Sequence, residues 1–464
     1  MSSNSTDNMY TAPRLNVDHI RSTITSLANK LNINKWDLGA TVNTETSVQV
    51  DHGESKQLKS SQRNSITVRV WNNQGLVGIT STSDISTQGL DRALKEASKA
   101  SILGNVNEIP NFSPLCKSEL AKIKNPIYPP CGIKRLLSQL KLAESELLSK
   151  HSSITSVPYN GIGETNSERI YMNSENALRY IESSYSSIYL YALTSEENRK
   201  PRSSGAIRLA NGFNDLDING CINEAAERTI SHLNYSPIAT GKYLICFTPE
   251  AFLDLIGAFS NIFNARSILD GVSISNKNSL GKTISVPFLS IIDNPLHPSH
   301  IGASTFDGEG TPTKKLSLIN SGRLDNFIHS ETTARIFGDK PTGHAGLGAK
   351  VSVGIDWLEV IGDTNNQSNE LSFDIDNYPG DYVLVESLNA LHSGIKASQG
   401  AFSLPFDGWM VKSGERISIE AATIAGDIKQ VLKEIICVEE SQKVTPQGIC
   451  PHVWVSSLSI TGEA

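Results

Sequence analysis

Two acidic residues that alternate with glycine are the first candidates for chemistry in this sequence. Asp307 and Glu309 are each followed by glycine, at Gly308 and Gly310, and Thr311 comes next. Carboxylates on a rigid loop could accept hydrogen bonds from N–H or amine groups of a bound ligand. An Asp/Gly turn can also use its carboxylate to satisfy its own backbone. The sequence is compatible with both interpretations.

Histidines form the second group of candidates. His344 lies in a glycine-rich stretch that begins at Thr342, and it could line a cleft, although a lone loop histidine usually has a structural role. The stretch lacks the strand-then-helix context of a dinucleotide fingerprint. His297 and His300 have the i, i+3 spacing of a helical metal site. Nearby prolines argue against a helix and no third ligand is close, so we expect a solvated loop there.

The six cysteines do not form a recognisable ligand set. None belongs to a C-x-x-C pair, so we expect free thiols in a reducing compartment. Cys437 follows two isoleucines, which favours a buried apolar role. Cys450 and His452 are close in sequence, but no acid or oxyanion loop accompanies them as in a cysteine nucleophile.

Composition narrows the class of protein. The chain has 464 residues, 38% hydrophobic and 19% charged residues, and a net charge of -7. Lys and Arg are not clustered, which argues against a nucleic-acid partner. No apolar run is long enough for a membrane span, and Met1 to Thr11 lack the apolar core of a signal peptide. We therefore expect a cytoplasmic protein with no membrane or nucleic-acid partner.

The elements that would position these residues suggest an α+β fold. Val48 and Val50, and then the alternating Ile66, Val68 and Val70, predict two strands, and the second ends in a hairpin turn after Trp71. We expect a disordered tail (1–14), a first α+β domain (15–103), a linker (104–130), a middle α+β domain (131–236) and a large, mostly antiparallel β-rich C-terminal domain (237–464).

One helix in the C-terminal part has clear start signals. Thr248 is a good N-cap, Pro249 suits the first helical position and Glu250 suits the first turn. The apolar residues that follow are spaced as a core face or a partner interface, and these are Phe252, Leu255, Phe259 and Phe263. Further along the chain the pattern predicts glycine-punctuated strands, with a single later helical run at 428–436.

Several segments together resemble the TldD/PmbA family of heteromeric zinc peptidases. Ser65 to Ser83 reads SITVRVWNNQGLVGITSTS, similar to the family's first-domain hairpin. Phe306 to Thr313 reads FDGEGTPT and is similar to its F-D-x-E-G-x-P-T motif. The runs LINSGRLDNFIHSETTAR from Leu318, TGHA from Thr342, GAFS from Gly400 and TIAGD from Thr423 follow in the family's order. The resemblance extends over most of the chain after residue 15.

The resemblance implies that this chain lacks the metal site of the family's catalytic member. That member carries H-E-x-x-x-H, in which two histidines hold zinc and the glutamate is the general base. The corresponding positions here fall near Gly257, Ala258 and Ile262, and no histidine or cysteine occurs between Thr248 and Leu296. We therefore expect no catalytic residues, no metal ligands and no cofactor in this chain.

By this resemblance the chain is a TldE/PmbA-type, substrate-positioning subunit. A TldD-like catalytic partner would supply zinc, and unfolded or small peptides would bind in extended form or have their leaders trimmed. The expected substrate-binding residues are Asp307, Glu309, Gly310, Thr311 and His344. Two alternatives remain: a self-sufficient hydrolase that uses His344 with Asp307 and Glu309, and a non-proteolytic regulator of a toxin–antitoxin or DNA gyrase system.

Overall fold

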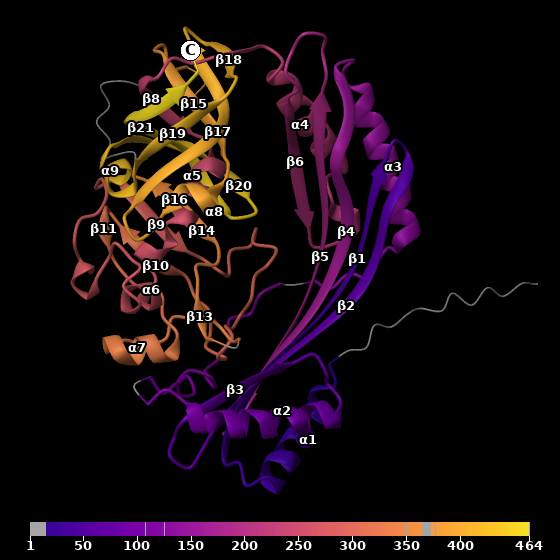
Figure 1. Cartoon of the computed structure of the whole chain (residues 1–464), viewed down its shortest axis with the longest axis vertical. Helices are drawn as coiled ribbons and strands as arrows, with labels where there is room; N and C mark the ends of the chain where they lie inside the picture. The colour runs from indigo at the N-terminus through magenta and orange to yellow at the C-terminus, as the bar shows by residue number, and fades with distance from the viewer. Residues whose placement is uncertain are drawn as a thin grey trace, which may run out of the picture.

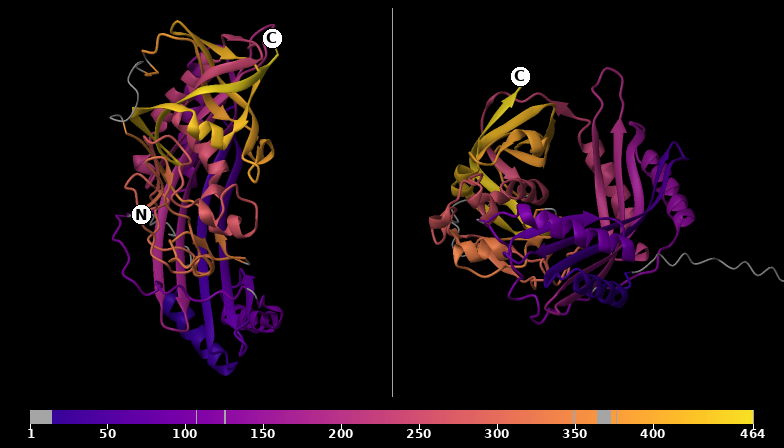
Figure 2. Two further views of the ribbon diagram at one scale, coloured as in Figure 1. Left: turned by 90° about the vertical axis from the view of Figure 1, so that its left-hand side faces the viewer. Right: turned by 60° about the horizontal axis from the view of Figure 1, so that its bottom comes forward.

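The protein consists of two tall bodies that stand next to each other and join at both ends. A computed structural model describes residues 15–106, 108–124, 126–348, 350–363, 373–375 and 377–463. One body is a long, curved sheet with helices on its outer side, and the other is a compact β-rich body (Figures 1 and 2). The expected tail at 1–14 lies outside the described residues.

The first body is a six-stranded antiparallel sheet with the order β3-β2-β1-β4-β5-β6. Its strands are β1 (Lys35–Asp51), β2 (Glu54–Trp71), β3 (Val77–Thr82), β4 (Ile154–Asn173), β5 (Leu178–Thr194) and β6 (Ser203–Ala210). Strand β1 pairs with β4 over twelve residue pairs, from Asp37↔Asn173 to Val48↔Ile162. The segments expected to form two N-terminal domains therefore share one continuous sheet.

Even-numbered residues of β1 face helices near both ends of the strand. Leu38, Ala40 and Val42 are buried under the first pair of helices, and Val48 and Val50 under the second pair. The first pair is α1 (Val17–Lys30) and α2 (Thr87–Ala100), and the second is α3 (Ile133–Ser149) and α4 (Ile218–Ser231). Because side chains alternate across a strand, the odd-numbered residues must point to the other face.

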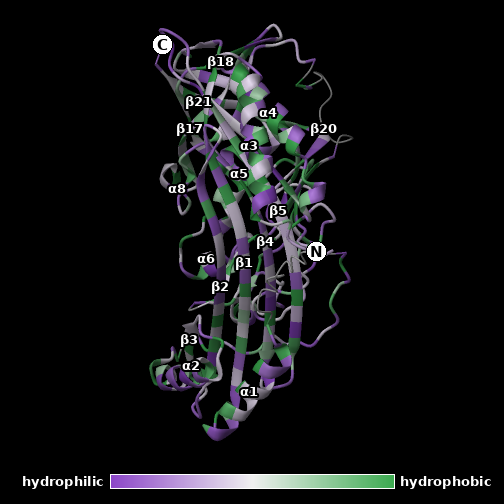
Figure 3. Ribbon diagram, turned by 90° about the vertical axis from the view of Figure 1, so that its right-hand side faces the viewer, coloured by the Kyte–Doolittle hydropathy of each residue, from purple (hydrophilic) through white to green (hydrophobic). Residues whose placement is uncertain are grey.

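The first two strands are longer than the alternation of apolar residues predicts. The expected strands at Thr46–Asp51 and Ser65–Trp71 lie within β1 and β2, which run for 17 and 18 residues. Much of β2 from Glu54 to Asn64 is polar and exposed, and Figure 3 shows hydrophilic residues along the strand. Helix α1 was not predicted, because its buried stripe of Ile20, Ile24 and Ala28 is diluted by polar residues.

The second body is built on a thirteen-stranded, mostly antiparallel sheet, so the predicted α+β class is confirmed. Its strands are β7 (Tyr235–Ser236), β8 (Gly241–Phe247), β9 (Leu289–Asp293), β10 (Leu316–Asn320), β11 (Arg323–Leu324), β14 (Leu358–Gly362), β15 (Tyr382–Leu388), β16 (Ile395–Lys396), β17 (Ala401–Lys412), β18 (Glu415–Ile419), β19 (Ala422–Asp427), β20 (Ile435–Thr445) and β21 (Gly448–Gly462). A separate small hairpin contains β12 (Ala345–Gly346) and β13 (Ser352–Val353).

The second body also contains short helices. They are α5 (Pro249–Ala258), α6 (Ala265–Leu269), α7 (Glu331–Phe337), α8 (Leu391–Gly394) and α9 (Ile428–Lys433). The prediction of only one helical run after the α5 region was wrong. Helix α7 is specified by a capping box between Ser330 and Thr333, which apolar periodicity does not reveal.

Helix α5 begins and ends as its sequence suggests, but it is short. The Thr248 side chain accepts a hydrogen bond from the Ala251 N–H, and Pro249 occupies the first turn. The helix ends at Ala258, and a 3-10 turn, η3 (Ser260–Ile262), follows. The apolar residues of the helix and of the turn after it, Phe252, Leu255, Phe259 and Phe263, are at most 1% exposed and lie within this chain's own core. The choice between core and partner interface is therefore settled in favour of the core.

Candidate functional site

The Phe306–Thr313 motif folds into a closed loop that uses its own carboxylate. Asp307 Oδ1 accepts hydrogen bonds from the N–H groups of Glu309 and Thr311, each at 2.9 Å. Its second oxygen, Oδ2, accepts from the Ala345 N–H at 3.0 Å. All three donors are backbone groups of this chain, so the turn satisfies itself in the manner of an Asp/Gly turn.

Glu309 ties this loop to the long sheet through a buried charge cluster. Its Oε1 accepts from Arg69 Nη1 at 3.0 Å, and its Oε2 accepts from the Glu331 N–H at 2.8 Å. The same guanidinium holds Asp37, with Nη2 at 2.5 Å and Nε at 2.9 Å from the two oxygens. Arg69, Asp37 and Glu309 side chains are all 0% exposed.

Strand alternation explains why an arginine reaches this position. Val68 and Val70 point into the core under α2, so Arg69 between them must point to the opposite face. Asp37 on β1 lies directly across from Arg69 in the strand register, which brings the two charges together. Tyr171 on β4 completes the cluster by donating its hydroxyl to Asp37 Oδ2 at 3.1 Å.

Burial sets the protonation behaviour of this cluster. Desolvation raises the pKa of Glu309 to about 7, and the Arg69 guanidinium opposes that rise. Desolvation also raises the pKa of Asp307, while its backbone hydrogen bonds pull the pKa down. For Arg69, burial alone would lower the pKa, but the contact with Asp37 leaves the pKa well above its ordinary value. The guanidinium is thus permanently charged between two acids.

Further contacts fasten the same loop to the sheet. Arg179 Nε donates to the Gly310 carbonyl at 3.2 Å, and Arg169 donates to the Phe306 carbonyl. Thr311 Oγ1 donates to Ser113 Oγ at 2.8 Å, in the segment between the two halves of the sheet. The predicted site residues Asp307, Glu309, Gly310 and Thr311 therefore lie together in a buried junction, and none of these contacts leaves a group facing an open cleft.

His344 lies beside this junction and is 7% exposed. Its Nδ1 is 2.8 Å from Thr342 Oγ1. Its Nε2 is 3.3 Å from Asp293 Oδ2 but is not aligned for a hydrogen bond with it. Because these groups and the two loop carboxylates are buried, the arrangement does not favour hydrolysis of a bound peptide there.

A second junction joins the two bodies at their other end. Arg228 on α4 contacts Glu250 on α5 at 3.3 Å and Glu386 on β15 at 3.6 Å. His232 Nε2 lies 3.0 Å from Glu386 Oε2. Lys443 on β20 lies 2.7 Å from Glu250. Burial alone would raise the pKa of Glu250, but the Lys443 ammonium keeps the pKa below its ordinary value.

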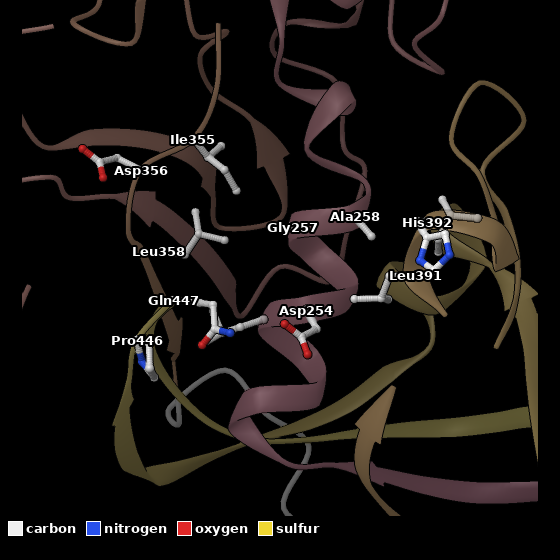
Figure 4. A pocket seen from close by; sticks show the side chains of 12 residues that line it. Asp254, Gly257, Ala258, Ile355, Asp356, Leu358, Leu391, His392, Pro446 and Gln447 are labelled. Carbon is white, nitrogen blue, oxygen red and sulfur yellow. The ribbon is translucent and has the colours of Figure 1, made fainter. Parts of the chain in front are cut away.

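An open pocket of about 680 Å³ lies along α5, beyond this second junction. Helix α5 contributes one wall, and segments next to β14, α8 and the β20–β21 turn contribute the others (Figure 4). Its lining residues are Leu253, Asp254, Gly257, Ala258, Ile355, Asp356, Leu358, Leu391, His392, Ile395, Pro446 and Gln447. Gly257 and Ala258, the positions that the resemblance matches to the catalytic member's first histidine and glutamate, therefore face a pocket.

The residues present do not fit a zinc ion. Gly257 and Ala258 carry no lone pair, and Ile262, the third matched position, is buried in the core at 4% exposure and does not line the pocket. Across the described ranges, no three His, Cys, Asp or Glu side chains are grouped so that they could hold a metal. A zinc site needs three or four such ligands.

Asp254 is the functional candidate that sequence reasoning missed. Its carboxylate extends from α5 into the pocket between Leu391 and Gln447 (Figure 4). Within the described part of the chain it has no hydrogen-bond or ion-pair partner. Burial raises the pKa of Asp254 to about 6, and repulsion from Glu250 adds to the rise. The signal available in the sequence was a single acid inside the apolar run from Ala251 to Ala258.

We expect Asp254→Asn to stabilise the fold, and more so at high pH. The folded-state pKa of about 6 exceeds the ordinary 3.8, so the free energy of unfolding falls as pH rises from about 4 to about 6 and stays lower above that. Removing the charge should add about 1 kcal/mol at pH 8, after allowance for solvent screening, and less at pH 5. Urea unfolding at both pH values measures the difference, and an equal effect at both would contradict this assignment.

The remaining candidates have structural roles. His297 and His300 lie in a turn, as expected, but they are stacked on Trp357 and so are not a freely solvated pair. His300 Nε2 also lies 3.1 Å from Asp356 Oδ1. All six cysteines are free thiols. Burial raises the pKa of Cys437 to about 12, which leaves it a protonated and unreactive thiol.

With this geometry in place, comparison with known proteins gives consistent matches. Three consecutive domains match: PmbA/TldA metallopeptidase domain 1 at residues 36–101, the central domain at 130–233 and the C-terminal domain at 240–462. Metalloprotease PmbA of Escherichia coli O157:H7 is 24% identical over 433 residues, which cover 90% of each chain. The zinc metalloprotease TldD homolog of Saccharolobus solfataricus is 24% identical over 361 residues, which cover 70% of this chain and 76% of that protein.

The fold is shared with a solved structure as well. The crystal structure of TldE from Thermococcus kodakarensis aligns with a TM-score of 0.80 at 18% sequence identity. The alignment covers 96% of this chain and 99% of that chain, so both bodies and their connection are included.

Among the described residues, no helix is both long enough and apolar enough to cross a membrane.

Proposed function

Because the chain belongs to the PmbA/TldD family of metallopeptidases, we propose that it is the non-catalytic, substrate-positioning subunit of a zinc peptidase complex. A TldD-like partner chain would hold the zinc ion and the general base. This chain would hold an unfolded or leader peptide so that its backbone reaches the partner's metal. In such a complex one chain positions the peptide and the other carries out the metal chemistry. Positioning alone can lower the activation free energy by several kcal/mol.

One observation carries the proposal: the pocket-facing side of α5 offers a hydrogen, a methyl group and a single carboxylate, from Gly257, Ala258 and Asp254. A peptidase metal needs imidazole, thiolate or several carboxylate ligands around one point. The small side chains of this helix leave space in the pocket, and the helix adds one carboxylate beside apolar neighbours. These properties suit a binding surface better than a metal centre.

An extended peptide could also pair its backbone with an edge strand of the long sheet. The long sheet ends at β3 on one side and β6 on the other, and β6 follows directly on the Tyr-rich β5. Backbone pairing with an edge strand gives affinity with little dependence on sequence. That property suits a complex that processes unfolded chains.

The direct test is a hydrolysis assay with a quenched fluorescent, unfolded peptide. We expect the purified chain alone to give no zinc-dependent cleavage. Adding a family member that carries H-E-x-x-x-H should give cleavage faster than that member alone. Replacing the motif glutamate of that member by glutamine should abolish cleavage, which assigns the chemistry to the partner. Chelator-sensitive cleavage by this chain alone, at the rate of the complex, would refute the proposal.

A further inference from the structure

Asp254 differs from every other acid near the α5 pocket because it lacks a cation. Glu250, one turn earlier on α5, is paired with Lys443 and Arg228. Glu386 is paired with His232 and Arg228. Asp356, on the opposite wall, lies 3.1 Å from His300. Among the described residues no such contact exists for Asp254, although it is half-buried.

The surroundings of Asp254 make an unpaired charge costly. The pocket wall around it consists largely of aliphatic side chains, namely Leu253, Ile355, Leu358, Leu391 and Ile395. A carboxylate in such surroundings loses hydration and gains nothing in return, unless a ligand supplies the opposite charge. At neutral pH and above it is still mainly ionised, because burial raises its pKa only to about 6. The pocket therefore presents one unpaired negative charge beside largely apolar walls, because its other lining acid, Asp356, is paired with His300.

This combination selects a particular kind of ligand. A divalent cation needs six or more oxygen ligands, or several nitrogen and sulfur ligands, and no such group exists among the described residues. A guanidinium has five donors and favours bidentate acceptors or aromatic faces, whereas this pocket offers one unpaired carboxylate, the Gln447 amide, the His392 ring and largely aliphatic walls. A primary ammonium is compact, has three donors and can be attached to an apolar chain.

We propose that the α5 pocket binds a protonated primary amine of a peptide, with its ammonium group on Asp254 and its adjacent apolar side chain against the aliphatic wall. The amine is either the amino terminus of the peptide or a lysine side chain. The inference rests on the proposed peptide-positioning function and makes it specific. It gives the subunit a means of fixing which end, or which residue, of an extended peptide lies at α5.

The test measures peptide binding to the isolated chain at pH 7.5, without partner or hydrolysis. Three peptides share one apolar sequence with a C-terminal fluorophore. The first has a free amino terminus and no lysine, the second has an acetylated terminus and one lysine, and the third has an acetylated terminus and no lysine. The proteins are the natural chain, Asp254→Asn, and Asp356→Asn as a matched control that removes a second acid from the same pocket.

We expect at least one amine-bearing peptide to bind the natural chain about tenfold more tightly than the third peptide, as a charge-assisted hydrogen bond implies. Asp254→Asn should abolish that preference, and Asp356→Asn should retain it. Whichever peptide shows the preference identifies the source of the amine. Circular dichroism confirms that both variants are folded.

Three outcomes would overturn the inference. They are equal binding of all three peptides to the natural chain, an unchanged preference in Asp254→Asn, and no measurable binding of any peptide. None of these outcomes would contradict the proposal that the chain is a non-catalytic subunit. That proposal is tested separately, by the hydrolysis assay with the partner.

Discussion

Replacing Arg69 by methionine is expected to destabilise the protein by roughly 3–5 kcal/mol, because it removes the one cation from a buried cluster of charges. Asp37 and Glu309 would then remain buried without the guanidinium that holds both. Methionine keeps the length and much of the volume of the side chain, so lost packing contributes little to the effect. The free energy of unfolding from urea titration measures the change.

The consequence should be concentrated at the junction. Glu309 belongs to the second body and Arg69 to the sheet, so their separation releases the Phe306–Thr313 loop from β1 and β2. Amide hydrogen exchange of residues 305–313 should accelerate in Arg69→Met more than exchange elsewhere.

A surface ion pair provides the control for Arg69→Met. Lys95 and Asp91 on α2 are also joined, at 2.6 Å, but both are solvent-accessible. Lys95→Met should cost at most about 0.5 kcal/mol. If Arg69→Met and Lys95→Met had similar small effects, the junction would not depend on the charge cluster.

Gly310→Ala is expected to be the second most damaging change, at roughly 2–4 kcal/mol. Gly310 has a φ of +73°, which favours glycine, and an added Cβ would overlap the buried ring of Tyr171. Tyr171 cannot easily move away, because it is 1% exposed and donates to Asp37. A shift of the thermal midpoint measures the effect.

Gly338→Ala separates the two causes of this effect. Gly338 follows α7 with a φ of +74°, nearly the same as that of Gly310, but no atom lies within 4 Å of an added Cβ. Its substitution should therefore show the backbone cost alone, about 1–2 kcal/mol. An equal loss of stability in both variants would mean that the contact between the loop and Tyr171 is not important.

Arg69→Met and Gly310→Ala together test whether the F-D-x-E-G-x-P-T motif fastens the two bodies or binds substrate. Its carboxylates were predicted to bind substrate, and in the structure they are 5% exposed or less and bonded to Arg69 and to backbone N–H groups. If the motif fastens the two bodies, both variants should lower stability. Their effect on peptide binding by molecules that remain folded should be small. The expectation of a substrate role can be judged by that comparison.

Apolar alternation and helix start signals correctly predicted individual strands and helix starts. The alternation from Ile66 to Val70 predicted a strand with one buried face, and the Thr248-Pro249-Glu250 sequence predicted the start of α5. The same alternation also implies that Arg69 points away from the core. What it points toward could not be predicted, because Glu309 is 240 residues away in sequence.

Three features lay beyond sequence patterns for physical reasons. The first part of β2, from Glu54 to Asn64, is polar and has no buried residue, so no apolar period marks it as a strand. Helix α7 depends on a capping box and on a buried turn rather than on an apolar stripe. The burial of Asp307 and Glu309 depends on tertiary partners, since a charged glycine-rich segment alone resembles a surface loop.

The α5 pocket was predicted only in part. The family resemblance matched Gly257 and Ala258 to metal-site positions, and both line the pocket. It also matched Ile262, which lies in a 3-10 turn and points into the core because the helix ends at Ala258. The contributions of α8 and the β20–β21 turn come from segments more than 130 residues later, and no local pattern reports them.

The most direct test of the account is the zinc content of the isolated chain, purified without chelator and measured by atomic emission alongside the hydrolysis assay. If positioning belongs to this chain and the metal to its partner, the isolated chain should contain far less than one zinc per molecule and leave the peptide intact. The reconstituted complex should contain partner-bound zinc and cleave it. One tightly held zinc ion in this polypeptide alone, together with cleavage, would contradict the account.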